Sequence, residues 1–258
     1  MGKIVKIGCC GFPVSRRKYY VIHRLVELQK TFYNLPSRKW AEKIRAEAPR
    51  EFEFTVKAWQ VITHPHRSPT WRKLQNKPAG NIENYGWLKP TNENIEALTK
   101  TLEIADVLGA KIIVLQTPGS MPYSEESKKW VYEFFDKAGE TVSNNYLLGW
   151  EPRGEWAKHI SEYREILREH RIIHVVDPFR YESVSIVDGI AYYRLHGIGG
   201  GEVNYRYKYS VEDLEKLASI LEKTVFETAY VLFNNVYMLD DSRKFKEILR
   251  KHPSLTPV

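Results

Sequence analysis

Eight short β-prone runs recur along this chain, and each ends in a polar or charged residue. The runs are Ile4–Cys10, Val26–Tyr33, Phe52–Lys57, Ile112–Gln116, Leu147–Glu151, Ile172–Asp177, Ala191–His196 and Tyr230–Asn235. Helix-like stretches separate most of them, which is typical of a (β/α)8 barrel with its chemistry at the C-terminal strand ends. The sequence therefore predicts an α/β fold, a single (β/α)8 TIM-like barrel whose strand ends provide the candidate site residues.

The length of the chain fits one such barrel. Its 258 residues match the roughly 250 that the fold needs, and no Gly/Ser tract, Pro-rich spacer or block of like charge divides them. We therefore expect residues 1–258 to form one domain. The segment Ala58–Pro90, after the third run, exceeds a simple connector and is predicted to be a long binding loop or lid.

Cysteine usage and hydropathy predict a cytoplasmic protein. No apolar run approaches the roughly 20 residues of a membrane span, and the N-terminal segment lacks a secretory signal pattern. The only cysteines, Cys9 and Cys10, are adjacent, so we expect no disulfide framework. They are interpreted as small buried apolar side chains, or alternatively as a thiol pair at the barrel mouth. The high charge also suits a thermophilic protein.

Capping residues and periodicity predict where several elements begin and end. Ser37 is expected to cap a helix through Glu47, and Gly109 to end the next one. Ser210 opens a predicted capping box, and Glu27, Gln29 and Thr31 are expected on one face of the second strand. The predicted helices include Trp40–Glu47, Asn92–Leu108, Ser124–Thr141, Glu155–His170 and Ser242–Lys251.

Polar side chains suited to catalysis lie at or just past the strand ends. They are Gln116, Glu151, Asp177, His196 and Asn234. Because burying a charge is costly unless it is paired, carboxylates that meet in one barrel mouth are either paired or functional. We interpret Glu151 and Asp177 as a base and an acid or electrostatic partner. His196 would shuttle the proton, since the ordinary pKa of histidine lies near neutrality.

Three cations accompany these residues. Lys57 is predicted to point into the barrel, Arg153 lies two residues past Glu151, and Arg194 shares a strand face with His196. Such cations hold phosphate or carboxylate groups by charge-assisted hydrogen bonds. A net charge of +7 also favours an anionic partner through long-range attraction. We therefore expect an anionic small-molecule substrate.

Other interpretations of these residues stay open. Glu151, Asp177 and His196 would suit a divalent metal such as Mn, Zn or Fe, although the sequence has no HExxH, HxH or Cys/His cluster, and no metal ligand is assigned. The charged residues could instead form an internal salt-bridge layer that closes the barrel.

Basic and aromatic residues are interleaved in two segments. One is Ala58–Pro90, and the other is Tyr205-Arg206-Tyr207-Lys208-Tyr209. This composition is typical of nucleic-acid surfaces, but it also fits an extended segment with one packed face. Tyr207 is a candidate substrate contact because barrels often bind phosphate at the loops after strands seven and eight.

Ordered motifs along the chain resemble the DUF72, or YecE-like, family. They are EL-x-x-TFYNLP with a Trp four residues on, F-x-F-x-VK followed by ITH, LQTP, WEPRGEW, VVDPF, YYRLHG, Y-x-Y-x-YS and FNN. The resemblance runs from Gly8 to about Asn235, and it implies a TIM-like barrel of unknown biochemical function. The shared polar positions that it implies are Glu27, Tyr33, Lys57, His64, Gln116, Glu151, Arg153, Asp177, Arg194, His196, Asn234 and Asn235.

Three hypotheses of function follow. The first is a hydrolase-like enzyme that uses acid/base or metal-assisted chemistry on an anionic or phosphate-bearing substrate. The second is a nucleic-acid-binding or nucleic-acid-processing protein, whose binding would depend on salt. The third is a non-catalytic barrel that captures a metabolite.

Overall fold

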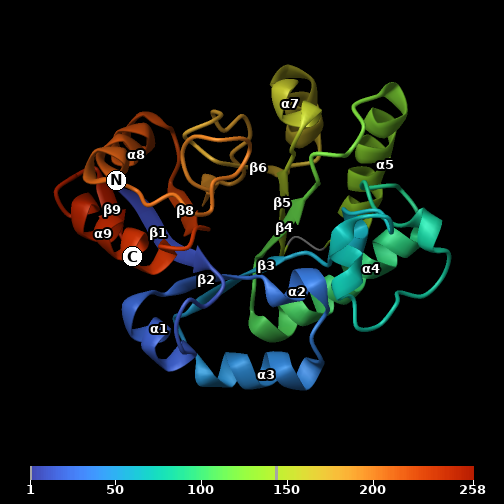
Figure 1. Ribbon diagram of the computed structural model, residues 1–258, viewed down its shortest axis with the longest axis horizontal. Coiled ribbons are helices and arrows are strands. Elements are labelled where there is room, and N and C mark those ends of the chain that lie inside the picture. The colour runs from blue at the N-terminus through green and yellow to red at the C-terminus, as the bar shows by residue number, and fades with distance from the viewer. Residues whose placement is uncertain (1, 143–144) are drawn as a thin grey trace. The chain divides into compact units, whose positions relative to one another are not determined.

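The predicted barrel is present in the computed structural model, which describes residues 2–142 and 145–258 (Figure 1). The strand order is β2-β3-β4-β5-β6-β7-β8-β1-β9, and an additional β2–β1 pairing closes eight parallel strands into a TIM-like barrel. The prediction of an α/β barrel is therefore confirmed. The strands are β1 Lys3–Cys10, β2 Leu25–Leu28, β3 Glu53–Lys57, β4 Ile112–Gln116, β5 Leu147–Glu151, β6 Ile173–Val176, β7 Ile190–Leu195, β8 Thr228–Phe233 and β9 Leu255–Pro257.

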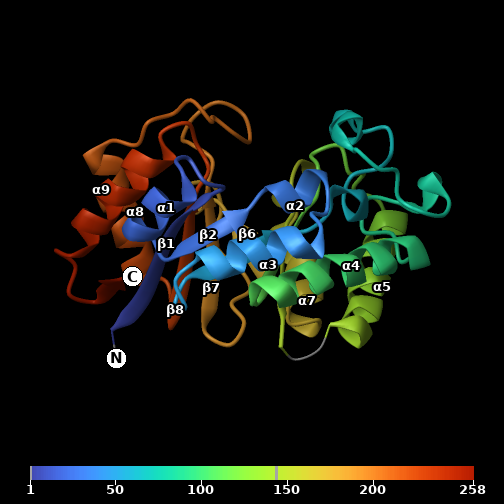
Figure 2. The same ribbon diagram turned by 90° about the horizontal axis from the view of Figure 1, so that it is seen from below.

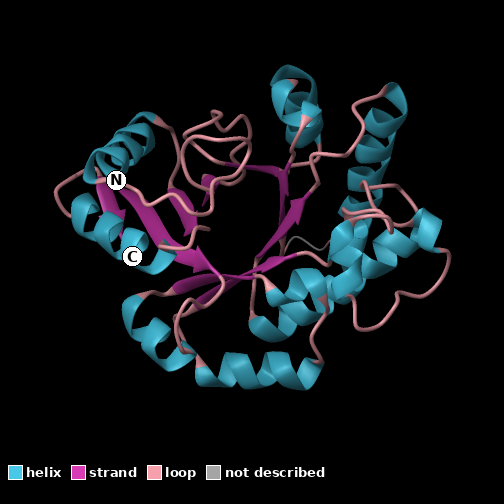
Figure 3. Ribbon diagram, viewed as in Figure 1, coloured by secondary structure: helices cyan, strands magenta, loops and turns pink. Residues whose placement is uncertain are grey.

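Helices connect most of these strands (Figure 3). Short 3-10 turns interrupt the segment after β3, which forms a long loop as predicted, while its role as a binding loop or lid stays a prediction. The helices are α1 Arg16–Ile22, α2 Lys30–Tyr33, α3 Arg38–Glu47, α4 Asn92–Leu108, α5 Glu125–Thr141, α6 Glu155–Lys158, α7 Ile160–Glu169, α8 Val211–Lys223 and α9 Met238–Leu249, and the 3-10 turns are η1 Gln60–Ile62, η2 Pro69–Lys73 and η3 Ile82–Asn84.

Local side-chain chemistry explains why several helices begin and end as predicted. Ser124 and Ser210 form capping boxes at the starts of α5 and α8, and the Ser37 hydroxyl accepts a hydrogen bond from the Trp40 amide. Gly109 ends α4 with φ of 66°, a left-handed conformation that glycine adopts without a steric penalty.

The second strand is shorter than predicted. β2 ends at Leu28, and residues 30–33 form the short helix α2. The Thr31 hydroxyl lies 2.9 Å from the Leu28 carbonyl and 2.7 Å from the Lys57 carbonyl, so it bonds to the backbone instead of continuing a strand face. The expectation that Gln29 and Thr31 share a strand face with Glu27 is therefore wrong.

Two helix predictions also need correction. The predicted helix Glu155–His170 divides into α6 and α7 at His159, whose φ and ψ are −103° and 50°. Its imidazole stacks on Tyr123 at 3.9 Å between ring centroids, a packing contact that the sequence pattern did not indicate. The closing helix α9 begins at Met238 rather than Ser242 and ends at Leu249.

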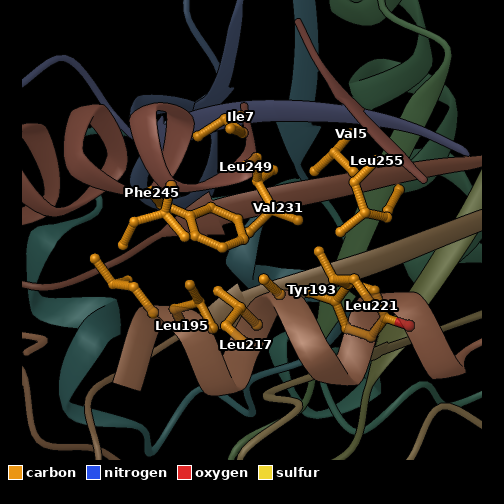
Figure 4. Packing of buried hydrophobic residues seen from close by; sticks show 14 of the residues in the cluster. Val5, Ile7, Tyr193, Leu195, Leu217, Leu221, Val231, Phe245, Leu249 and Leu255 are labelled. Carbon is orange, nitrogen blue, oxygen red and sulfur yellow. The ribbon is translucent and has the colours of Figure 1, made fainter. Parts of the chain in front are cut away.

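The strands and helices gather into two compact units. The first comprises Met1–Glu27, Ala48–Glu53 and Ile173–Val258. Within it, β1 pairs in parallel with β2, β8 and β9, and β7 pairs with β6 and β8. Phe245 and Leu249 of α9 and Leu217 of α8 pack with Val231 of β8 in a buried cluster (Figure 4). Each such side chain contributes roughly 1.5–3 kcal/mol of transfer free energy.

The second unit comprises Leu28–Glu47 and Phe54–Ile172. Its strands β3, β4 and β5 pair in parallel, with Val56 opposite Ile113 and Gln116 opposite Glu151. Helix α3 lies beside α4, and α4 beside α5 (Figure 2). The prediction that residues 1–258 form one domain stays a prediction.

The two cysteines are buried free thiols, as the interpretation of small apolar side chains expects. Burial raises the pKa of Cys9 to about 11 and that of Cys10 well above its ordinary value, which disfavours the reactive thiolate. In the described part of the chain, no helix is both long and apolar enough to cross a membrane.

Candidate functional site

The last residues of β3 and β4 meet in the second unit. Lys57 ends β3 and is only 7% exposed, and its Nζ donates to the Gln116 Oε1 at 2.9 Å. The same ammonium lies 3.9 Å from the centroid of the Phe32 ring, a cation–π contact. The sequence placed Lys57 and Gln116 at neighbouring strand ends, and the structure adds the hydrogen bond between them; their contact with a substrate stays a prediction.

The end of β5 supplies a carboxylate and a guanidinium in contact. Arg153 donates from both Nε and Nη2 to the Glu151 Oε1, at 2.8 and 2.7 Å. Gly154 follows with φ of 67°, and a Cβ there would lie 2.3 Å from the Gly119 carbonyl oxygen. Only glycine fits, so the backbone after β5 lies directly against the backbone after β4.

His64 belongs to the same group of side chains. Burial, followed by the positive charges of Lys57 and Arg153, lowers its pKa to about 3. Its Nδ1 lies 2.8 Å from the Thr63 hydroxyl, and the Phe32 ring meets it edge-on. His64 is therefore neutral near pH 7 and close to two cations. We call Lys57, His64, Gln116, Glu151 and Arg153 the second-unit cluster.

Tyr33 lies among residues that the sequence analysis did not single out. The Lys73 Nζ lies 4.4 Å from its ring centroid, and the Gln60 Nε2 donates to its carbonyl oxygen at 3.0 Å. The Gln60 Oε1 and the Trp59 Nε1 are buried without a hydrogen-bond partner among the described residues. No sequence signal identified Trp59 or Gln60, because they follow β3 in a segment read only as a loop.

In the first unit, Glu27 and Arg194 form a wholly buried ion pair. The Arg194 Nη2 donates to the Glu27 Oε1 and the Tyr192 hydroxyl donates to the Glu27 Oε2, both at 2.9 Å. Neither charged side chain is exposed at all. This arrangement matches the salt-bridge layer considered from the sequence, while direct contact of Glu27 or Arg194 with a substrate stays a prediction.

Asp177 and His196 also lie together in the first unit. The Asp177 Oδ2 accepts from the His196 amide at 2.9 Å, and its Oδ1 accepts from the Phe179 amide at 3.1 Å. The Asn234 Nδ2 lies 3.1 Å from the His196 Nδ1. With the amide in this orientation, Nδ1 accepts and the proton of the neutral imidazole lies on Nε2.

Tyr207 and Asn235 make internal contacts around the loop after β7. The Tyr207 hydroxyl donates to the Asp213 Oδ2 at 2.7 Å. The Asn235 Nδ2 donates to the Tyr207 carbonyl at 2.8 Å and to the Asp241 Oδ2 at 2.6 Å. These bonds hold the loop in place, and substrate contact by either side chain stays a prediction.

Arg180 also holds this loop, and the sequence analysis missed it. Its guanidinium donates to the carbonyl oxygens of Gly197, Gly199 and Gly201, at 2.9, 3.3 and 2.6 Å. Its Nε also lies 3.9 Å from the Asp177 Oδ2. The VVDPFR segment contains Arg180, but nothing in the sequence indicates which carbonyls it reaches.

The described residues contain no group of three or more His, Cys, Asp or Glu side chains arranged to hold a metal ion. The metal interpretation of Glu151, Asp177 and His196 therefore gains no support from the geometry within either unit.

The comparisons with known proteins agree with the motifs. Residues 15–257 match the model of a family described as a protein of unknown function, DUF72. This chain belongs to the DUF72 family. A DUF72 protein from Thermotoga maritima shares 25% identity over 96% of this chain and 99% of its own, with a TM-score of 0.67. One from Enterococcus faecalis shares 15% identity over 96% and 98%, with a TM-score of 0.72.

The barrel is also similar to that of an enzyme outside the family. Endonuclease IV from Thermus thermophilus shares 11% identity over 97% of this chain and 100% of its own, with a TM-score of 0.56. At this identity the likeness concerns the fold. No curated protein matches the DUF72 chain.

Proposed function

We propose that this DUF72 protein is an enzyme that binds an anionic, phosphate- or carboxylate-bearing small molecule and transforms it by acid/base chemistry, as a hydrolase does. The observation that carries this proposal is the placement of Lys57 and Arg153 around a neutral, buried His64 at the ends of β3 and β5. In TIM barrels the C-terminal strand ends carry the active site.

The cluster offers distinct chemical roles. Lys57 and Arg153 would contact the anion, whose negative charge offsets their mutual repulsion. Glu151, in its carboxylate form, would act as the general base, and the Gln116 amide would orient the substrate. Neutral His64 has one nitrogen that donates and one that accepts, so it can pass a proton without becoming a cation.

Two sequence predictions remain part of this proposal. Asp177 and His196 directly follow β6 and β7, where catalytic residues of this fold occur. We assign them the roles of acid or electrostatic partner and proton shuttle. Asn234, which lies beside the His196 imidazole, would hold its tautomer.

The test is a panel of phosphomonoesters, phosphodiesters, lactones and carboxylate esters assayed with purified protein. For any substrate found, Glu151→Gln should lower kcat by about 10²–10⁴-fold. The matched control is Glu155→Gln, which removes an exposed carboxylate paired with Lys158 in the following helix. Unchanged turnover in Glu151→Gln would remove the assignment, and tight binding without turnover across the panel would favour a metabolite-binding barrel.

A nucleic-acid-processing function is the second candidate. It is favoured by the loop after β7, where Tyr205 is 43% exposed and the Lys208 ammonium lies 5.2 Å from the Tyr237 ring. The fold likeness to endonuclease IV is consistent with it. Retention on DNA or RNA that weakens steeply with salt, and weakens further in Lys208→Gln, would support it. Absence of retention at low salt would exclude it.

A further inference from the structure

We infer that a second anion site, built to bind monohydrogen phosphate, lies in the first unit near the N-terminal ends of β2 and β3. A pocket of about 220 Å³ is lined there by residues of α1, α9 and the segment before β3. Its lining residues are Tyr20, Val21, Ile22, Arg24, Pro49, Glu51, Phe52 and Lys246.

Backbone hydrogen bonds and ring packing hold the residues that line the pocket in place. The Glu53 amide donates to the Arg24 carbonyl at 2.7 Å, which holds the start of β3 against the start of β2. The Tyr20 ring packs edge-on against Phe52 at 4.6 Å between centroids, and the Phe52 amide donates to the Pro49 carbonyl at 3.0 Å. The backbone and rings thus fix the positions from which Arg24 and Lys246 reach the pocket.

Two cations line this pocket, and neither is held in an ion pair among the described residues. Among the described residues, neither the Arg24 guanidinium nor the Lys246 ammonium makes a hydrogen bond or an ion pair. Burial, then Arg24 and Arg250, lower the pKa of Lys246, so the cations are near enough to repel one another. A bound anion would relieve this repulsion, and it would accept hydrogen bonds from both side chains.

Glu51 determines which anion fits. Glu51 also lines the pocket, and its carboxylate would repel an anion that has no proton to share. Monohydrogen phosphate carries an O–H group that can donate to this carboxylate, while sulfate is fully ionised near neutral pH and cannot. A site that offers two cations and one acceptor should therefore prefer phosphate, because sulfate leaves the carboxylate unsatisfied and adds repulsion.

This site is separate from the second-unit cluster. Arg24 immediately precedes β2 and Glu51 lies two residues before β3, so both are at the N-terminal strand ends, whereas Lys57 is the last residue of β3. A phosphate bound in this pocket would stabilise the folded protein by mass action. Phosphate binding here is independent of the catalytic function proposed for the second-unit cluster.

The test is titration of the full-length protein with inorganic phosphate, followed by amide chemical shifts in ¹H–¹⁵N spectra and by calorimetry at pH 7.5. Phosphate should shift the amides of residues 20–24, 50–52 and 246. Lys246→Met and Arg24→Gln should each weaken the affinity measured at these amides at least tenfold. Sulfate should bind at least tenfold more weakly than phosphate, and Glu51→Gln should reduce that preference.

The controls are Lys244→Met, an exposed lysine on the same helix, and Arg17→Gln, an exposed arginine on α1. Both should leave the affinity unchanged, and far-ultraviolet circular dichroism verifies the fold of every variant. No shift of these amides at 20 mM phosphate would overturn the proposal, as would equal weakening by the control variants. Equal affinity for sulfate would overturn the role given to Glu51. Shifts confined to residues around Lys57 would place phosphate in the second-unit cluster only, and would also overturn it.

Discussion

Charged side chains lie at or near the C-terminal strand ends in both compact units, but their surroundings differ between the units. In the first unit, Arg194 and Glu27 neutralise each other in a fully buried pair that Tyr192 completes. In the second, burial keeps His64 neutral, and the nearby charges of Lys57 and Arg153 add to this effect by lowering its pKa further. The buried pair in the first unit is neutral as a whole, and removing one partner would leave an uncompensated charge. In the second unit Glu151 pairs with Arg153, while Lys57 bonds to a neutral amide, so an anion could gain energy by binding there.

The largest expected effect comes from breaking the buried pair. Arg194→Met leaves the Glu27 carboxylate buried without its cation, so we expect the free energy of unfolding to fall by about 3–5 kcal/mol. Urea denaturation measures this change. The double variant Glu27→Gln/Arg194→Met removes both charges and should recover a large part of the loss. A cost below about 1 kcal/mol for Arg194→Met would show that the two units do not differ in this way.

The same kind of substitution in the second unit should act on ionisation and binding. Lys57→Met removes one of the two cations near His64, so the pKa of His64 should rise from about 3 toward the ordinary value. Affinity for an anionic ligand of the cluster should weaken about tenfold or more, through loss of a charge-assisted hydrogen bond. Imidazole carbon shifts followed against pH measure the first effect. Lys73→Met, beside Tyr33, is the control and should leave the pKa unchanged.

One histidine in each unit should make the free energy of unfolding fall at acidic pH. Folding lowers the pKa of His64 to about 3 and that of His23 to about 4, from 6.5. The unfolded chain therefore binds more protons between these values, so stability is fully present above pH 6.5 and is lost as pH falls toward 3 or 4. Each group contributes a slope of at most about 1.4 kcal/mol per pH unit.

Replacing either histidine separates the two contributions. His64→Gln and His23→Gln should each flatten the decline of unfolding free energy below pH 6.5, as measured by urea denaturation at several pH values. His66→Gln serves as the comparison within the second unit. An unchanged slope in both variants would contradict the role given to these two buried imidazoles.

The smallest expected effect comes from removing one helix N-cap in each unit and comparing the two losses of stability. Ser124 caps α5 in the second unit and Ser210 caps α8 in the first, each in a capping box. Ser124→Ala and Ser210→Ala should each cost about 1 kcal/mol by thermal unfolding, because each frees a helix amide from its side-chain acceptor. Two separate transitions, with each variant shifting a different one, would show that the units unfold independently.

The sequence predicted elements whose determinants are local. β4 and β5 begin and end where their apolar runs do, and Gly109 and Ser210 are read directly as a helix end and a helix cap. The strand prediction failed at Thr31, because its hydroxyl bonds to the carbonyl of Lys57, which lies 26 positions away. Periodicity contains no information about such a bond.

For the candidate site, the sequence names residues but does not indicate which of them contact one another. Strand ends and strand faces pointed to Lys57, Glu151 and Arg194 as candidates without coordinates. That Arg194 pairs with Glu27, 167 positions earlier, depends on the fold bringing β2 and β7 residues together. The contribution of Lys57 and Arg153 to the low pKa of His64 likewise depends on distances that exist only in the folded protein.

The backbone contact between Gly154 and Gly119 has a consequence for how this protein can change. Because the loops after β4 and β5 touch without an intervening side chain, neither can be rebuilt alone. A substitution at Gly154 would displace the Glu151–Arg153 pair and the β4 loop together. Libraries that alter these two loops should therefore keep Gly154, because any side chain there would strike the backbone at Gly119.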